Sequence, residues 1–81
     1  MNIYVGSLAY EFDDRQLKKL FEEHGSVTSG RVITDRASGE SKGFGFVEMP
    51  DDAEARRAIA ALNEQDVDGR KLRVNEARPR N

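Results

Sequence analysis

The chain of 81 residues contains no cysteine, no tryptophan and only one histidine. Without cysteine it forms no disulfide and offers no thiolate to a metal, and the single histidine, His24, has no second ligand cluster beside it. No apolar run approaches the roughly 20 residues that span a bilayer, and the N-terminus lacks the charged and apolar segments of a secretory signal. We therefore expect one cytoplasmic domain that binds no metal or cofactor and contacts no membrane.

Patterns typical of enzymes are also missing. Gly43 and Gly45 are not followed by the third glycine and the helix of a dinucleotide-binding loop, and the P-loop lysine pattern is absent. No Gly-x-Ser-x-Gly elbow accompanies His24. The sequence predicts a protein that is not an enzyme and has no small-molecule substrate.

Charge is unevenly distributed along the chain, although the net charge is only −2. Acids outnumber bases by five to three in residues 11–23 and by six to two in residues 51–68, whereas residues 70–81 carry five bases and one acid. Acids in a layer behind a sheet would lie more than one Debye length, about 8 Å, from the far face of that sheet. The local charge therefore says more about partners than the net charge does.

Hydrophobic patterns with the periods of strands and helices alternate along the chain. Two helices are predicted from capping boxes, the first formed by Asp13 and Gln16 and the second by Asp51 and Glu54. Asp68-Gly69 predicts a tight turn. Strands are predicted over residues 2–6, 27–34, 42–49 and 70–77.

The predicted order is strand, helix, strand, strand, helix, strand. This order predicts an α+β fold of the ferredoxin-like β-α-β-β-α-β type. A four-stranded antiparallel sheet would have both helices on one face, and its other face would be open. We expect residues 1–77 to form the domain and residues 78–81 a short basic tail.

The third predicted strand contains the most informative segment, Lys42-Gly43-Phe44-Gly45-Phe46-Val47-Glu48-Met49. Because side chains alternate along a strand, Phe44 and Phe46 project from the same face. If helices cover the other face, both rings stand on the open one, where the glycines would leave bare backbone for a flat ligand. A basic residue beside exposed aromatic rings is typical of binding to single-stranded nucleic acid.

Two motifs resemble those of a known family. The octapeptide over residues 42–49 meets seven of the eight positions of the pattern K/R-G-F/Y-G/A-F-V-x-F/Y, and Ile3-Tyr4-Val5-Gly6-Ser7-Leu8 is similar to its companion hexapeptide. The chain thus resembles the RNA recognition motif (RRM) domain. Because it starts at Met1 on the first strand and stops soon after the last, it also resembles stand-alone single-RRM proteins of bacteria. The resemblance implies a monomer that binds single-stranded RNA in post-transcriptional regulation or RNA chaperoning.

The resemblance also implies roles for individual residues. Tyr4 and Phe46 would each stack on a base, Phe44 would lie against a ribose, and Lys42 would pair with a phosphate. Hydrogen bonds to base edges would come from the backbone and side chains of three residues at the end of the last strand: Asn75, Glu76 and Ala77.

Basic residues outside the two motifs extend the predicted interface. Arg31 and Arg73 fall at outward positions of the second and fourth strands, where they would contact phosphates or stack on bases. Arg78 begins the basic tail and is a further predicted RNA contact.

Three positions depart from the pattern of the family. Ser7 stands where the hexapeptide usually has asparagine, which affects the turn into the following loop. Met49 replaces a final aromatic residue at a position that often packs inward, and Glu64 follows the second helix where glycine is common. None of these departures removes an exposed aromatic residue.

Two other partners stay open at this point. Some RRM-like domains bind peptides, through the helical face or where the sheet aromatics are lost, whereas this chain keeps its aromatics. Single-stranded DNA is a second alternative, because base stacking alone does not read the 2′-hydroxyl group.

Overall fold

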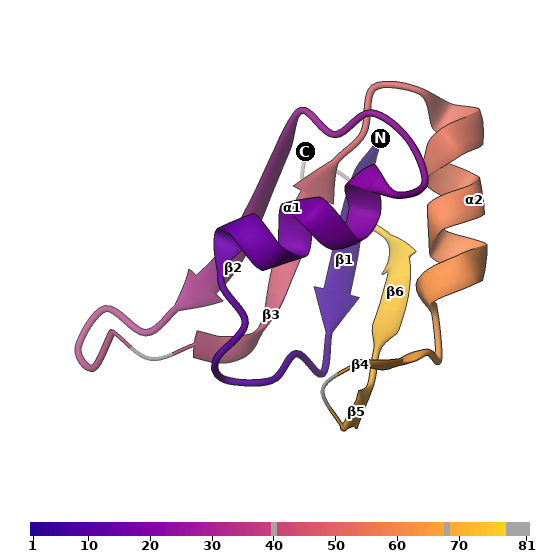
Figure 1. The fold of residues 1–81 in the computed structure, drawn as a ribbon. Coiled ribbons are helices and arrows are strands. Elements are labelled where there is room, and N and C mark those ends of the chain that lie inside the picture. Colours follow the sequence, from indigo (N-terminus) through magenta and orange to yellow (C-terminus); the bar gives the residue numbers. More distant parts are fainter. Residues whose placement is uncertain (40, 68, 78–81) are drawn as a thin grey trace.

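A computed structural model describes residues 1–39, 41–67 and 69–77, with Ser41 and Lys42 described by their backbone only. The main sheet and the two helices follow the predicted order (Figure 1). The first strand has its predicted bounds, and the second and third strands differ from the predicted ones by one or two residues. The elements are β1 (Asn2–Gly6), α1 (Asp14–Glu22), β2 (Ser29–Thr34), β3 (Ser41–Glu48), α2 (Asp52–Leu62), β4 (Asp66–Val67), β5 (Arg70–Lys71) and β6 (Arg73–Glu76).

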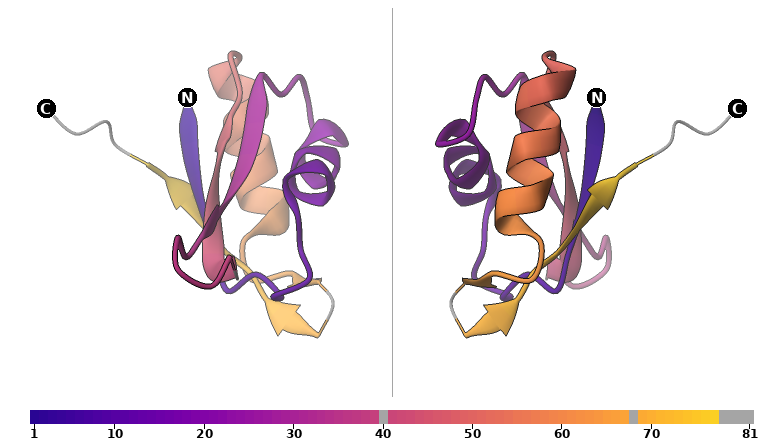
Figure 2. Two further views of the ribbon diagram at one scale, coloured as in Figure 1. Left: turned by 90° about the vertical axis from the view of Figure 1, so that its left-hand side faces the viewer. Right: turned by 90° about the vertical axis from the view of Figure 1, so that its right-hand side faces the viewer.

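The main sheet has the strand order β2-β3-β1-β6, with each neighbouring pair antiparallel. Both helices lie on one face of this sheet, and among the described residues no helix covers the other face (Figures 1 and 2). The predicted ferredoxin-like arrangement is therefore confirmed. One face of the sheet is left open to a ligand.

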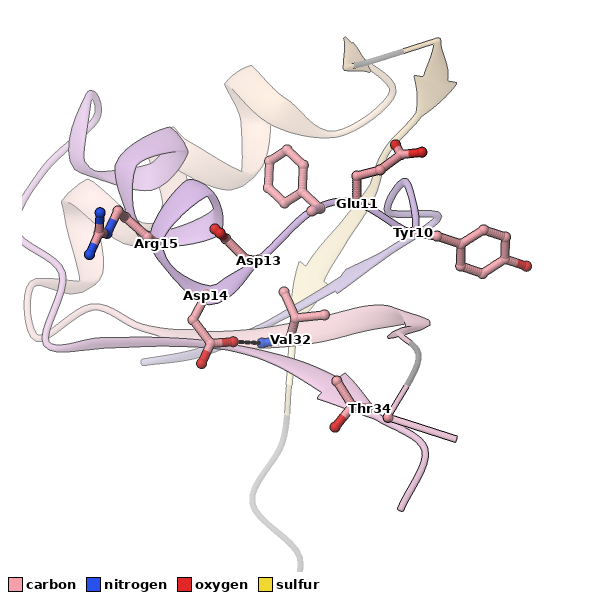
Figure 3. A pocket seen from close by; sticks show the side chains of 9 residues that line it. Tyr10, Glu11, Asp13, Asp14, Arg15, Val32 and Thr34 are labelled. Carbon is pink, nitrogen blue, oxygen red and sulfur yellow. Dashed lines mark hydrogen bonds between the residues drawn. The ribbon is translucent and has the colours of Figure 1, made fainter. Parts of the chain in front are cut away.

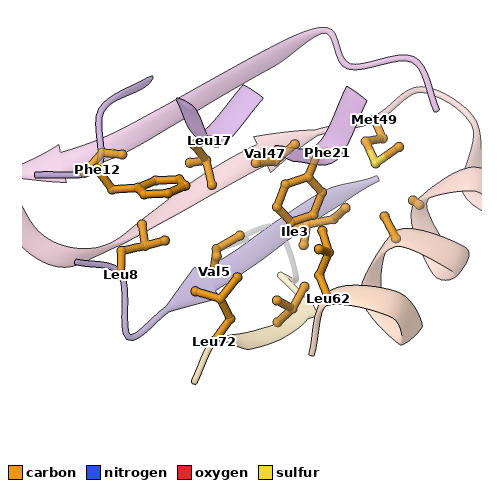
Figure 4. Close-up of a cluster of buried hydrophobic side chains, with 14 residues drawn as sticks. Ile3, Val5, Leu8, Phe12, Leu17, Phe21, Val47, Met49, Leu62 and Leu72 are labelled. Atoms are coloured by element: carbon orange, nitrogen blue, oxygen red, sulfur yellow. The ribbon is translucent and has the colours of Figure 1, made fainter. Parts of the chain in front are cut away.

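The hydrophobic core lies between the sheet and the two helices (Figure 4). Met49 takes the position where the family usually has an aromatic residue, and its side chain is fully buried in this core. Strand residues reach the core at alternate positions, as the period of two requires. The core consists of Ile3, Val5, Leu8, Phe12, Leu17, Phe21, Val32, Val47, Met49, Ala55, Ala58, Leu62, Leu72 and Val74.

The first helix starts as predicted. The Asp13 carboxylate accepts a hydrogen bond from the Gln16 amide (2.8 Å), and the Gln16 side chain accepts one from the Asp13 amide (3.0 Å). In α2 the Asp51 carboxylate accepts from the Glu54 amide. The prediction that the Glu54 side chain completes a second capping box is wrong. The Glu54 carboxylate instead accepts a hydrogen bond from the amide of Ser26, 3.1 Å away in the loop after α1.

The predicted last strand, residues 70–77, is interrupted at Leu72. The Leu72 amide donates to the Gln65 carbonyl, and its own carbonyl accepts from the Glu64 amide. Its backbone is therefore paired with the segment after α2 and not with β1. As a result β5 forms a separate two-stranded hairpin with β4, and only β6 joins the main sheet. Asp68 of the predicted turn and the tail 78–81 lie outside the described residues.

Candidate nucleic-acid interface

Three aromatic rings form one cluster on the open face of the sheet. Tyr4 of β1 lies directly opposite Phe46 of β3, and Phe44 lies opposite Gly6. The ring centre of Tyr4 is 6.1 Å from that of Phe44 and 5.9 Å from that of Phe46, and the two phenylalanine centres are 6.2 Å apart. These separations are within the range of direct aromatic contact. The rings therefore support one another and form a continuous apolar platform.

The platform is accessible from solvent. Phe46 is 40% exposed, and Tyr4 and Phe44 beside it are half-buried. The Tyr4 ring leans over Gly6, so that a Cβ added there would lie 2.6 Å from the tyrosine hydroxyl. The absence of a side chain at Gly6 therefore lets the Tyr4 ring take this position beside Phe44.

Polar and charged side chains flank the platform on the neighbouring strands. Arg31 lies opposite Phe46, and Asn75 lies opposite Tyr4, so both share the face of the rings. Arg73 lies opposite Gly6 and is on the same face. Both arginines are exposed. The structure thus brings together six of the ten predicted site residues: Tyr4, Arg31, Phe44, Phe46, Arg73 and Asn75.

The other four predicted residues are placed differently. Glu76 lies opposite the buried Ile3, so its side chain is on the helix side of the sheet. The Ala77 amide donates to the Asn2 carbonyl (2.8 Å) and is already engaged in the sheet. The side chain of Lys42 and the whole of Arg78 lie outside the described residues.

Three polar residues that were not among the predicted site residues also share the open face. Glu48 lies opposite both Asn2 and Ser29, in the row next to the one that contains Phe46. Glu48 belongs to the octapeptide, whereas Asn2 and Ser29 lie outside both motifs. Strand alternation would have placed all three side chains on the open face. Tyr10, in the loop after β1, is an exposed aromatic residue that the sequence analysis did not single out; it is 66% exposed. The Arg70 guanidinium lies 5.2 Å from the centre of its ring.

A hollow of about 660 Å³ lies between the start of α1 and β2, away from the aromatic platform (Figure 3). Glu11, Asp13 and Asp14 line it, and the Asp14 carboxylate accepts a hydrogen bond from the Val32 amide (2.7 Å). Arg15 also lines the hollow, but three carboxylates outweigh one guanidinium group and repel phosphate groups, so this hollow is a poor site for nucleic acid despite its size. Among the described residues no group of three or more acidic or histidine side chains is arranged to hold a metal ion. Nor is any helix of the described segments long and apolar enough to span a bilayer.

Comparison with known proteins agrees with this geometry. A family model described as RNA recognition motif matches residues 3–73. The chain belongs to the RNA recognition motif family. The crystal structure of an RNA-binding protein named PG1 is 56% identical and superposes with a TM-score of 0.95, covering 100% of this chain and 98% of that one. A structure titled as a Sxl-lethal protein/RNA complex is 34% identical with a TM-score of 0.92, covering 99% of this chain and 48% of that one.

A curated relative, the chloroplastic 28 kDa ribonucleoprotein of Nicotiana sylvestris, is 54% identical over 80 residues, which are 96% of this chain and 29% of the relative. The chain spans about a third of the length of this relative and of its counterpart from Spinacia oleracea. Further curated relatives at 46–53% identity are also plant proteins, several of them named chloroplastic. The expected likeness to bacterial stand-alone proteins therefore finds no support among these relatives, and the cytoplasmic location is not confirmed.

Proposed function

We propose that this protein binds single-stranded RNA on the open face of its sheet. The observation that carries the proposal is the cluster of Tyr4, Phe44 and Phe46, which faces away from both helices. Tyr4 and Phe46 stack on successive bases, and Phe44 contacts the ribose between them. Arg31 and Arg73, at the two sides of the cluster, neutralise phosphates.

The charges near the platform favour this role more than the net charge suggests. Among the described residues, no carboxylate lies within 4.0 Å of the Arg31 or Arg73 guanidinium group, so both are available to phosphates. The acids of α1 and α2 lie behind the sheet, in a layer about 10–12 Å thick. At physiological salt the Debye length is about 8 Å, so most of their repulsion is screened at the open face.

The expected affinity follows from the size of the platform. Stacking on an aromatic side chain is worth about 1–3 kcal/mol per base. Two stacked bases and a few phosphate contacts, less the cost of ordering the RNA, correspond to a dissociation constant of about micromolar. We expect recognition to tolerate different sequences on the two stacking rings, because every base has a flat face.

The names of the relatives support this proposal. They include ribonucleoproteins and RNA-binding proteins, and two of the similar structures were solved with RNA. We propose residues 1–77 as a monomeric, non-catalytic RNA-binding domain with a basic tail at 78–81, which acts in post-transcriptional regulation or RNA chaperoning. A cytoplasmic location, Lys42 and Arg78 as phosphate contacts, and base-edge contacts from Asn75, Glu76 and Ala77 stay predictions.

The test is fluorescence anisotropy with a labelled RNA of random sequence. We expect Phe46→Ala to weaken binding about tenfold and the Phe44→Ala/Phe46→Ala double variant to weaken it further, by the stacking energies above. Tyr10→Ala is the matched control, since it removes an exposed ring from a loop outside the cluster and should leave the affinity unchanged. Circular dichroism establishes that each variant is folded. Equal binding by the wild type and a folded double variant would refute the proposal.

Two further outcomes separate the alternatives. Single-stranded DNA of the same sequence tests whether the 2′-hydroxyl contributes, because stacking alone treats both nucleic acids alike. Chemical-shift mapping by nuclear magnetic resonance locates the contact surface. RNA should shift Tyr4, Phe44 and Phe46, whereas a peptide partner bound to the other layer would shift α1 and α2.

A further inference from the structure

A shallow hollow of about 230 Å³ lies at one end of the open face, beside the aromatic platform. Phe46 and Arg31 form the side of this hollow nearest the platform, and Asn2, Ser29 and Glu48 supply its polar lining. The last three belong to β1, β2 and β3 and occupy one row across the sheet. The hollow is smaller than the roughly 300–1,000 Å³ pockets that bind drug-sized ligands. It suits a flat fragment the size of one nucleobase.

Glu48 places a carboxylate on the face that we propose to bind RNA. An ionised carboxylate only accepts hydrogen bonds, and it repels the phosphate groups that Arg31 attracts. Glu48 is exposed, and among the described residues no basic side chain lies within ion-pair distance of it, Arg31 included. Its negative charge is therefore not neutralised by the neighbouring strand. The part of an RNA that would compensate for it is a base edge that donates N–H groups.

The four bases differ in what they offer to this pair of side chains. Along its Watson–Crick edge guanine presents an amino group, a ring N–H and a carbonyl oxygen, which is two adjacent donors followed by an acceptor. Glu48 accepts from two donors and Arg31 donates to a carbonyl, so the order matches. Uracil presents one donor between two carbonyls, and one of these would face the carboxylate. Adenine and cytosine each offer one amino donor beside a ring acceptor.

We propose that this hollow is a base-selective subsite that takes guanine. The base lies against the Phe46 side of the hollow, its N1–H and amino group donate to the Glu48 carboxylate, and its O6 accepts from Arg31. Asn2 and Ser29 fill the remaining polar positions around the base. This inference rests on the proposed RNA binding and adds a sequence preference to it, at a position next to the sequence-tolerant stacking rings.

The experiment compares short RNAs that differ at one base. A uridine oligomer of about six nucleotides, long enough to cover the sheet, is measured beside variants with one guanosine, adenosine or cytidine at each position in turn. We expect one guanosine position to tighten binding to the wild type about tenfold, as a good two-point base contact does. Adenosine and cytidine at that position should gain less.

Glu48→Gln is the informative variant, because it keeps the size of the side chain and replaces one acceptor by a donor. We expect it to abolish the guanosine preference and to bind the plain uridine oligomer more tightly than the wild type does. Glu22→Gln, which removes the same charge from the last residue of α1, is the matched control and should keep the preference. Thermal unfolding establishes that both variants are folded.

The outcomes distinguish this inference from the proposal on which it rests. If the wild type binds every oligomer with the same affinity, or if Glu48→Gln keeps the full guanosine preference, the guanine subsite is wrong while RNA binding stands. If the wild type binds none of the oligomers, both the RNA-binding proposal and the subsite are overturned.

Discussion

Gly6 offers a direct test of how the aromatic platform is held in place. Replacing it by alanine would put a Cβ 2.6 Å from the Tyr4 hydroxyl oxygen and 3.0 Å from two carbons of the same ring. Such contacts are too short to persist, so the ring has to move. Tyr4 is on the open face, where it is free to turn toward solvent and away from Phe44. We therefore expect Gly6→Ala to displace one stacking ring and leave the fold intact.

The expected effects on binding and on stability differ in size. Losing the stacking surface of Tyr4 removes about 1–3 kcal/mol of binding free energy, which is roughly 5- to 150-fold in affinity. Stability changes little, because the loss of an aromatic pair, about 0.5–1.5 kcal/mol, is offset by the smaller entropy of the unfolded alanine chain, about 0.4–1 kcal/mol. The free energy of unfolding should stay within about 1 kcal/mol of the wild type.

A double-mutant cycle with Tyr4→Ala decides whether Gly6 acts through the ring. RNA affinity is measured by anisotropy for the wild type, Gly6→Ala, Tyr4→Ala and the double variant. Once the ring is gone, the added methyl group has nothing to displace, so Gly6→Ala should cost almost nothing in the Tyr4→Ala background. An equal loss of affinity in both backgrounds would refute the reasoning, since the methyl group would then be obstructing the RNA itself.

Three further predictions concern strain, the sheet edge and salt. Glu64 has a φ of 68°, a left-handed conformation that costs a residue with a side chain about 1–2 kcal/mol. Glu64→Gly should therefore stabilise the protein by about 1 kcal/mol and raise its melting temperature by about 4–8 °C. An unchanged or lower melting temperature would contradict this. Asp14→Ala removes the acceptor of the Val32 amide and an acid from the first turn of α1, and should cost about 1–2 kcal/mol in urea unfolding, with Asp14→Asn in between. Arg31→Ala/Arg73→Ala should make the slope of log affinity against log salt shallower by about 1.4, which is about 0.7 for each phosphate that is no longer neutralised; an unchanged slope would show that neither arginine binds a phosphate.

The main elements were predictable because their signals are local. The capping box of Asp13 and Gln16 involves residues three apart, and the alternation within β3 follows from the period of the strand. The errors have two different sources. Glu54 binds the Ser26 amide 28 residues away, and no residue near Glu54 indicates that partner. Leu72 pairs with Gln65 and Glu64, seven and eight residues earlier; the predicted Asp68-Gly69 turn is consistent with this pairing, but the predicted strand over residues 70–77 did not take it into account.

Two of the residues that depart from the family pattern have an unusual backbone conformation, which the sequence alone did not reveal. Ser7 (φ 61°) and Glu64 (φ 68°) are the two residues other than glycine with positive φ in the described part of the chain. The residues usual at these positions, asparagine and glycine, are those that tolerate this conformation best. The sequence showed that the residues differed, but the backbone conformation that makes the difference costly became visible only in the structure.

The glycine between the two phenylalanines has a different role from the one expected for it. Gly45 faces the helices, where an added Cβ would lie 3.0 Å from a methyl group of Leu17 and in collision with the Arg31 carbonyl. Its missing side chain therefore lets α1 pack directly on the sheet and does not open a path for a ligand. Because strand residues alternate between faces, this close packing on one side comes with Phe44 and Phe46 on the other. The octapeptide thus both seats the first helix and builds the platform, which explains why so short a segment indicates both the fold and the binding face.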